Sequence, residues 1–203
     1  SVEINPLIIN RVNKISAKDP VINIYNHDSV KLVIDEARNF VSKSSDKYDL
    51  IYIPNTKRWG GTGVSSYALL ENYLYTEEAF RTYFEHLKED GILAMEDRTW
   101  FILRYIETVI SVMKKLNIDT TNRIALIQDE PHSVVLFKKD PFTNEELNNL
   151  RNASSKLRLS AALLQESDIE TFEKDAVTIE DNRPFYWNLY LLSTFINPGK
   201  MKY

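Results

Sequence analysis

The stretch VKLVIDEARNFVSKSSDKYDLIYIP, residues 30–54, has the order strand, helix, strand. Residues 31–34, Lys-Leu-Val-Ile, are a short run with β-branched side chains, and apolar residues at helical spacing follow it. Residues 48–53 are a second apolar run, which Pro54 ends because proline has no N–H to donate to a strand ladder. The order predicts two parallel strands joined by a helix.

Acidic and turn residues lie where these two strands end. Asp35 and Glu36 follow the first run directly, and Pro54 follows the second. In doubly wound sheets, ligands bind outside the carboxyl ends of the strands. We therefore expect these three residues at the edge of the sheet where ligand chemistry takes place.

The composition is that of an ordinary globular protein. The 203 residues suffice for one well-buried domain with a small appendage, and 43% are apolar and 27% charged. The net charge of −4 gives no support for nucleic-acid binding. The absence of cysteine excludes disulfides, thiolate chemistry and Cys-ligated zinc, and it favours a cytosolic setting. Three scattered histidines argue against a His-based metal site.

The two ends of the chain give further expectations. The apolar run at residues 189–196 is interrupted by Ser193 and Thr194 and is too short to span a bilayer. The aromatic residues 185–187 before it would suit either a membrane interface or a packed aromatic tail. Residues 2–4 already have the character of a strand, which predicts that the chain is a fragment.

Glu3 ends that first predicted strand. A helix follows at once, with Asn5 as its cap and Pro6 in its first position. An acid between a strand and a helix commonly accepts hydrogen bonds from ribose hydroxyls. A solvated strand-end carboxylate is the alternative.

The segment NTKRWGGTGVSS, residues 55–66, has the strongest loop character in the chain and holds three of its five glycines. It matches neither the P-loop nor the dinucleotide-binding glycine pattern. It could cover a site, with Trp59 as an apolar plug, or be a plain surface loop.

The remaining elements continue the alternation of helix and strand. We expect a helix over residues 77–87, a strand over 92–95, a helix over 101–116, and an antiparallel hairpin of strands over 123–128 and 133–138. Glu96, Asp97 and Arg98 form another charged group at a strand end. This alternation is typical of an α/β fold.

The character of the sequence changes after residue 140. A capping box at Thr143 predicts a helix through Leu150 or beyond, and residues 161–172 have the pattern of further helix. We expect an α/β domain over residues 1–140 and a helical extension over 141–203.

Several segments, taken in order and spacing, resemble the spermidine synthase family. They are VEINPLI (2–8), KLVIDEARNFV (31–41), YDLIYI (48–53), LYTEEAF (74–80) and HLKEDGIL (86–93). ENYLYTEEAF and the later DNRPFYW (181–187) are more similar to membrane-associated bacterial members, in which a synthase-like domain is joined to transmembrane helices.

The resemblance implies a Rossmann-like, three-layer fold of the class I methyltransferase type. Its seven-stranded sheet ends in a reversed strand that forms the C-terminal antiparallel hairpin. The glycine-rich loop after the family's first strand has no counterpart here, so we expect that first strand to be absent from the chain.

The resemblance also implies a site for S-adenosylmethionine or decarboxylated S-adenosylmethionine as co-substrate. Glu3 corresponds to the acid that takes the ribose hydroxyls. Glu36, with its neighbours Asp35 and Ala37, corresponds to the site of the adenine amine. The family usually has Asp and a small residue there, so Glu36 is a conservative departure.

The expected catalytic carboxylate is missing. Family members that transfer an aminopropyl group have an aspartate after the fourth strand as the base, where this chain has Pro54. Proline cannot accept a proton, and Lys57 and Arg58 would repel a cationic polyamine. The candidates to replace the aspartate are Glu71, Tyr73 and Asp97, and their spacing singles out none of them.

Three functions remain open from the sequence. The chain is a transferase that moves a methyl or aminopropyl group to a small molecule, an inactive nucleoside-binding or regulatory module, or a scaffold. The expected partners are a small-molecule substrate, a membrane-embedded remainder of the same protein and a second copy in a homodimer, without nucleic acid or metal. The expected location is the cytoplasm or the cytoplasmic face of the inner membrane.

Overall fold

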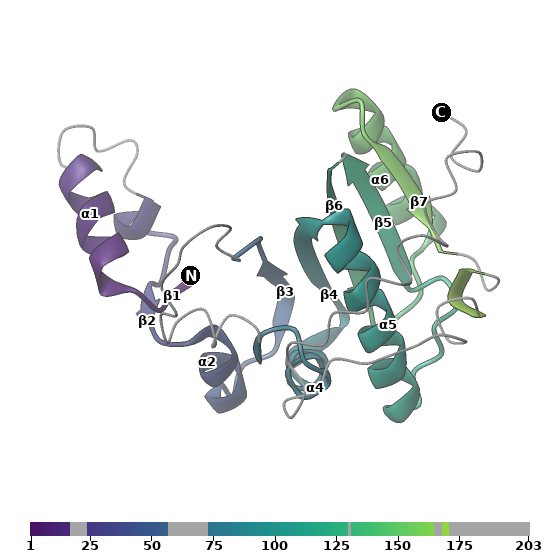
Figure 1. Ribbon diagram of the computed structural model, residues 1–203, viewed down its shortest axis with the longest axis horizontal. Helices are drawn as coiled ribbons and strands as arrows, with labels where there is room; N and C mark the ends of the chain where they lie inside the picture. Colours follow the sequence, from purple (N-terminus) through teal and green to yellow (C-terminus); the bar gives the residue numbers. More distant parts are fainter. Residues whose placement is uncertain (17–23, 57–72, 130, 165–167, 171–203) are drawn as a thin grey trace. The chain divides into compact units, whose positions relative to one another are not determined.

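The computed structural model describes residues 1–16, 24–56, 73–129, 131–164 and 168–170 (Figure 1). It contains two compact units, Ser1–Asp46 and Lys47–Tyr203, and each is described by itself. The expected boundary near residue 140 stays a prediction.

The first unit contains a small parallel sheet. Its elements are β1 (Val2–Glu3), α1 (Pro6–Ser16), the 3-10 helix η2 (Ile24–Asn26), β2 (Val33–Ile34) and α2 (Ala37–Lys43). β1 pairs with β2 in parallel, with Glu3 in register with Ile34. The strand and helix predicted at the start of the segment 30–54 are therefore confirmed.

The second unit contains a five-stranded mixed sheet in the order β3-β4-β6-β5-β7. The strands are β3 (Tyr48–Ile53), β4 (Leu87–Arg98), β5 (Ile124–Asp129), β6 (His132–Lys138) and β7 (Ser160–Leu163). β3 and β4 are parallel, whereas β6 runs antiparallel to both β4 and β5. The predicted hairpin and its reversed strand are thus confirmed.

The helices α4 (Glu77–His86) and α5 (Thr99–Lys115) pack on one face of this sheet. The strand residues that face them alternate with residues of the other face, so Leu93, Met95 and Asp97 of β4 are fully buried. The helices contribute their amphipathic faces to the same core, with the side chains of Phe80, Tyr83, Phe84, Tyr105, Ile106 and Met113. This packing fixes the end of β4, where the charged group predicted from the sequence lies.

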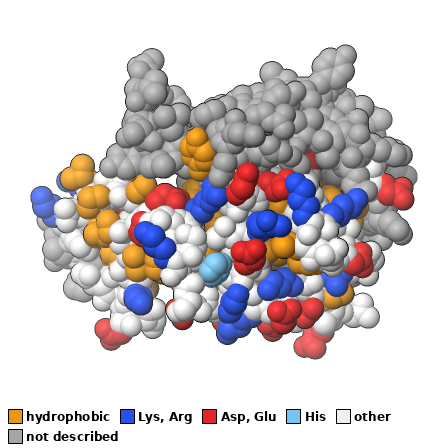
Figure 2. Space-filling view, turned by 90° about the horizontal axis from the view of Figure 1, so that it is seen from below, with side chains coloured by type: hydrophobic (Ala, Val, Ile, Leu, Met, Phe, Trp, Pro, Cys, Tyr) orange, Lys and Arg blue, Asp and Glu red, His pale blue; other side chains and the backbone are white. Residues whose placement is uncertain are grey.

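The opposite face of the sheet is more open. Leu50 and Tyr52 of β3 point to that side and are 57% and 51% exposed. Elsewhere, the described side chains on the face shown in Figure 2 intersperse Lys and Arg with Asp and Glu, as on an ordinary hydrated protein surface.

The pairing within each unit is a two-stranded sheet of β1 and β2 in the first and a five-stranded sheet in the second, and the single seven-stranded sheet stays a prediction. One expectation about the elements needs correction. The helix expected over residues 161–172 is wrong at its start, because residues 160–163 are strand β7, antiparallel to β5. After α6 (Asn144–Lys156), that pairing satisfies the backbone groups on the open edge of β5 and overrides the local helical pattern.

Within the described part of the chain, no helix is long and apolar enough to cross a bilayer. The aromatic run at residues 185–187, for which membrane contact was one interpretation, lies outside the described residues.

Candidate functional site

In the first unit, the acidic residues singled out from the sequence come together at one edge of the small sheet. Glu3 is the last residue of β1 and lies in register with Ile34, the residue before Asp35. The Glu3 carboxylate accepts a hydrogen bond of 2.7 Å from the backbone N–H of Asn5. Burial and then the charge of Glu3 raise the pKa of Tyr25. Glu3 and Asp35 therefore end adjacent parallel strands, as the sequence predicted.

Asp35 and Glu36 have different surroundings. The two oxygens of Glu36 accept hydrogen bonds from the N–H groups of Arg38 (2.9 Å) and Asn39 (2.8 Å), so its carboxylate caps α2, which begins at Ala37. Asp35 uses only Oδ1, which accepts from Glu36 N and Asn39 Nδ2, each at 2.8 Å. The hydrogen bond from Asn39 is the main cause that lowers the pKa of Asp35. Of the two acids, Asp35 keeps an oxygen, Oδ2, that no described residue uses.

In the second unit, the carboxyl end of β3 lacks an acid. Pro54 follows the strand directly and is exposed. The Thr56 hydroxyl then lies 2.9 Å from the Tyr75 hydroxyl. Lys57 and Arg58, expected to repel a polyamine, lie outside the described residues.

Asp97, one of the three candidate bases, is enclosed in the core. Its Oδ2 accepts a hydrogen bond of 2.6 Å from the Tyr105 hydroxyl, and its Oδ1 accepts one of 2.7 Å from Arg98 N. The Tyr105 ring stacks on Tyr75 with the ring centres 4.6 Å apart. Burial first, and then Tyr75 and Asp97, raise the pKa of Tyr105, so its phenol keeps its proton. In this arrangement Asp97 fixes Tyr105, and its catalytic role stays a prediction.

The other two candidate bases are less well defined by the structure. Tyr73 is half-buried just before α4, and its backbone carbonyl accepts a hydrogen bond of 3.4 Å from the Thr76 hydroxyl. Glu71 lies outside the described residues.

A pair that sequence reasoning missed lies near the same strand ends. The Tyr52 hydroxyl on β3 donates a hydrogen bond of 2.6 Å to Oε2 of Glu96 on β4. That bond is the main cause that raises the pKa of Tyr52 to about 12, so the phenol stays protonated and keeps donating. The alternation of side chains along β4 could have predicted this pair. Tyr52 is in register with Ala94, and Glu96 is the next residue of β4 on the same face as Ala94.

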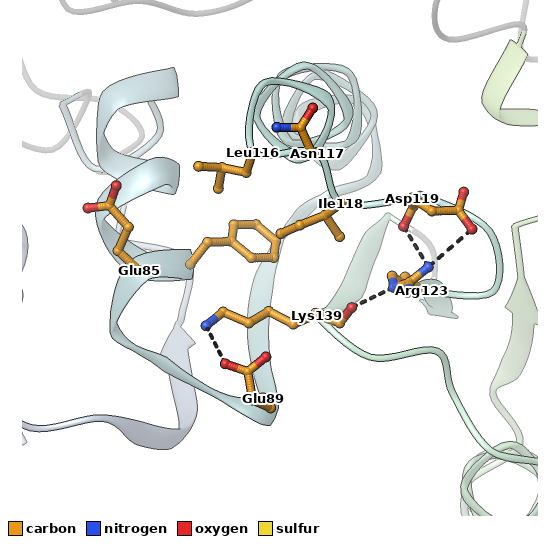
Figure 3. A pocket seen from close by; sticks show the side chains of 9 residues that line it. Glu85, Glu89, Leu116, Asn117, Ile118, Asp119, Arg123 and Lys139 are labelled. Carbon is orange, nitrogen blue, oxygen red and sulfur yellow. Dashed lines mark hydrogen bonds and ion pairs between the residues drawn. The ribbon is translucent and has the colours of Figure 1, made fainter.

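A cavity of 470 Å³ lies elsewhere in the second unit, at the amino-terminal end of β4 (Figure 3). Its two basic side chains are already engaged. Lys139 Nζ lies 2.8 Å from the Leu87 carbonyl oxygen and 3.7 Å from the carboxylate of Glu89, and Arg123 contacts Asp119. Because ligands of such sheets bind at the carboxyl ends of strands, this cavity is not the expected site.

The comparison with solved structures supports a fold class for this chain. The structural matches include a probable spermidine synthase from Corynebacterium glutamicum, with 16% identity and a TM-score of 0.57, covering 89% of this chain and 62% of that one. They also include spermidine synthase in complex with the transition-state analogue AdoDATO, with 15% identity and a TM-score of 0.47, covering 95% of this chain and 57% of that one. Human methyltransferase-like protein 13 in complex with SAH matches with 12% identity and a TM-score of 0.49, covering 95% of this chain and 75% of that one. The first match supports an α/β fold of the synthase type.

The family then follows from the sequence itself. The family model of the spermine/spermidine synthase domain matches residues 1–146, and the chain therefore belongs to that family. The resemblance noted from the segments is confirmed. The comparison with curated proteins found no significant match. The chain spans 62% of the length of the Corynebacterium protein, so the activity of a whole synthase is a proposal for this chain.

Proposed function

We propose that this chain is part of a transferase that moves a methyl or aminopropyl group from an S-adenosylmethionine-type donor to a small-molecule acceptor. The observation that carries the proposal is the family match over residues 1–146, which spans the strand-end acids Glu3 and Asp35. These acids end two adjacent parallel strands, the position at which α/β sheets bind nucleosides.

Each of these acids has a role in the proposal. Glu3 accepts the hydrogen bonds of the ribose hydroxyls, and Asp35 accepts one from the adenine amine. Asp35 is a better acceptor than Glu36 because both oxygens of Glu36 already cap α2. Asp35 is ionised at neutral pH, and its lowered pKa strengthens that preference, so both of its oxygens act only as acceptors.

The donor supplies an activated sulfonium, so transfer depends chiefly on bringing acceptor and donor together in line. The chain can therefore belong to an active enzyme without the aspartate that Pro54 replaces. The exposed Pro54 also favours a second candidate function, an inactive nucleoside-binding module. Conversion of bound donor to its thioether product distinguishes the two.

Substitution at the strand ends tests the nucleoside site. In the full-length protein, we expect Glu3→Gln and Asp35→Asn each to weaken donor binding by about tenfold, the effect of losing a charge-assisted hydrogen bond. Calorimetric titration measures the affinity. Asp46→Asn, an exposed acid of the same unit, is the matched control and should bind as the unmodified protein does. Unchanged affinity in both site variants would refute the proposed site.

A further inference from the structure

The cavity of 470 Å³ at the amino-terminal end of β4 has an apolar wall (Figure 3). Phe84 of α4 is fully buried in that wall, and Leu116 and Ile118 are half-buried. The last two flank Asn117, whose φ of 56° turns the chain out of α5, and Ile118 N then donates a hydrogen bond of 2.8 Å to the Met113 carbonyl. Main-chain geometry therefore fixes the wall, and the volume is within the range of small-molecule sites, roughly 300–1,000 Å³.

Two basic side chains line the same cavity. The side chains of Arg123 and Lys139 are only 15% and 17% exposed. Arg123 donates through Nε and Nη1 to main-chain carbonyl oxygens and to Asp119, and none of these bonds uses Nη2. Lys139 Nζ donates one hydrogen bond, of 2.8 Å, to the Leu87 carbonyl. These bonds hold both cations in place without using all of their donors.

The acids that line the cavity are more exposed than its bases. Glu85 is exposed, and the side chains of Glu89 and Asp119 are 86% and 68% exposed. Glu89 lies 3.7 Å from Lys139 Nζ, beyond hydrogen-bond distance. Water screens exposed charges strongly, whereas the enclosed cations act in a medium of lower dielectric constant. One negative charge is therefore favoured inside the cavity, whereas a second one would meet the exposed acids.

We propose that this cavity binds a small monocarboxylate with an apolar body. The carboxylate accepts a hydrogen bond from Nη2 of Arg123, and the charge of Lys139 attracts it to the same cavity. The apolar body lies against Phe84, Leu116 and Ile118, which removes its surface from water. The site lies within the second unit and needs no sulfonium donor, so the inference goes beyond the proposed function.

Three probes of similar length test the two parts of the ligand on the unmodified full-length protein. Hexanoate has a carboxylate and an apolar chain, hexanol lacks the charge, and adipate has a second carboxylate. Titrations followed by saturation-transfer NMR measure the affinity of each. We expect hexanoate to bind about tenfold more tightly than either analogue, because hexanol loses the charge-assisted hydrogen bond and adipate brings a carboxylate to Glu85 and Glu89. No hexanoate binding, or equal binding of either analogue, would overturn the inference.

Variants locate the site. Arg123→Gln should weaken hexanoate binding by about tenfold, since it removes the charge that the carboxylate contacts. Leu116→Ser should weaken it by roughly three- to tenfold, since it removes apolar contact and leaves both cations in place. Lys114→Gln, an exposed base of α5 outside the cavity lining, is the matched control and should bind hexanoate as the unmodified protein does. Unchanged hexanoate affinity in Arg123→Gln or in Leu116→Ser would contradict the proposed site.

Arg123 also donates to the Asp119 carbonyl in the turn after α5, so urea denaturation checks the folding of each variant. If Arg123→Gln does not fold, Leu116→Ser and the three probes decide the inference by themselves. Donor titration of the unmodified protein tests the proposed function separately. Hexanoate binding without donor binding refutes only the proposed function, and donor binding without hexanoate binding refutes only the carboxylate site.

Discussion

At the scale of single residues, neighbours in the sequence have opposite environments at the end of β4. Glu96 reaches solvent and accepts a hydrogen bond from Tyr52, whereas Asp97 is fully buried and accepts one from Tyr105. The sequence identified this charged group but could not rank its members, because their partners are 44 and 8 residues away. Only the register of β3 with β4 and the packing of α5 reveal which carboxylate a ligand can meet.

The buried pair makes a prediction about stability. Tyr105→Phe removes the donor to Oδ2 of the buried Asp97, and we expect it to lower the free energy of unfolding by roughly 1–3 kcal/mol, the cost of a buried acceptor that loses its partner. Urea denaturation measures the change. Tyr52→Phe removes an exposed phenol and should change stability by less than about 0.5 kcal/mol. Equal losses of unfolding free energy in both variants would show that the buried hydrogen bond from Tyr105 to Asp97 stabilises the protein no more than the exposed one from Tyr52.

Strand-end acids in the first unit were easier to predict. Glu3 and Asp35 were placed at strand ends from local patterns, since Glu3 lies just before the helix start at Asn5 and Asp35 follows the apolar residues 32–34. What the sequence did not show is that Glu36 caps α2 with both oxygens, a detail of side-chain geometry that depends on where the helix begins. That detail shifts the proposed nucleoside contact from Glu36 to Asp35.

At the scale of elements, β4 begins with an irregularity that requires glycine. Tyr48 pairs with Leu87 but Leu50 pairs with Ile92, so residues 88–91 bulge from the ladder. A Cβ atom at Gly91 would lie 2.8 Å from the carbonyl oxygen of Tyr48 and 3.0 Å from backbone atoms of Lys88. Backbone atoms cannot move aside as a flexible side chain can.

Gly91→Ala should therefore destabilise the second unit by roughly 1–3 kcal/mol through overpacking. Thermal or urea denaturation measures the loss. Asp90→Ala, at the exposed neighbouring position, is the control and should be nearly neutral. A Gly91→Ala variant as stable as this control would show that the bulge relaxes without cost.

The link between β6 and α6 gives a prediction about pH. Lys138 is buried, and its ammonium lies 2.6 Å from Glu146, which also completes the capping box with Thr143. The hydrogen bond from Lys138 is the main cause that lowers the pKa of Glu146 from 4.5. Because the folded-state pKa is the lower one, this stabilisation is complete above pH 4.5 and is lost as the pH falls through the folded-state value.

Glu146→Gln keeps the capping hydrogen bond but leaves the buried Lys138 without its counter-charge. We expect a loss of roughly 1–3 kcal/mol at pH 7, less than for a fully buried pair because Glu146 is partly exposed. The difference from the unmodified protein should shrink as the pH falls below 4.5 and through the lowered pKa of Glu146, because the carboxylate then takes up a proton. Glu145→Gln, an exposed neighbour, is the control. A loss that does not change with pH would contradict the assigned cause.

Elements were predictable where their signals are local. The caps at Thr76 and Thr143 and the hairpin of β5 and β6 follow from short sequence patterns. Strand β7 was missed because Ser-Ala-Ala-Leu carries little strand preference of its own, and its partners on β5 lie 32 (Gln128 and Ser160) to 38 (Ala125 and Leu163) residues earlier. Pairing across that distance decides its conformation.

At the scale of the whole molecule, the ordered set of segments predicted the family, and the match over residues 1–146 shows it. Each motif is short and unspecific by itself, and the position at which the resemblance predicts a catalytic aspartate holds Pro54. The central claim is that this chain belongs to a transferase that binds an S-adenosylmethionine-type donor through strand-end acids.

The most direct measurement is calorimetric titration of S-adenosylmethionine and of its decarboxylated form into the full-length protein, followed by analysis of the bound nucleoside. We predict that one of the two donors binds, and that the donor which the protein prefers identifies methyl or aminopropyl transfer. We also predict that the bound donor is converted to its thioether when an amine is added. Binding of neither donor would contradict the claim.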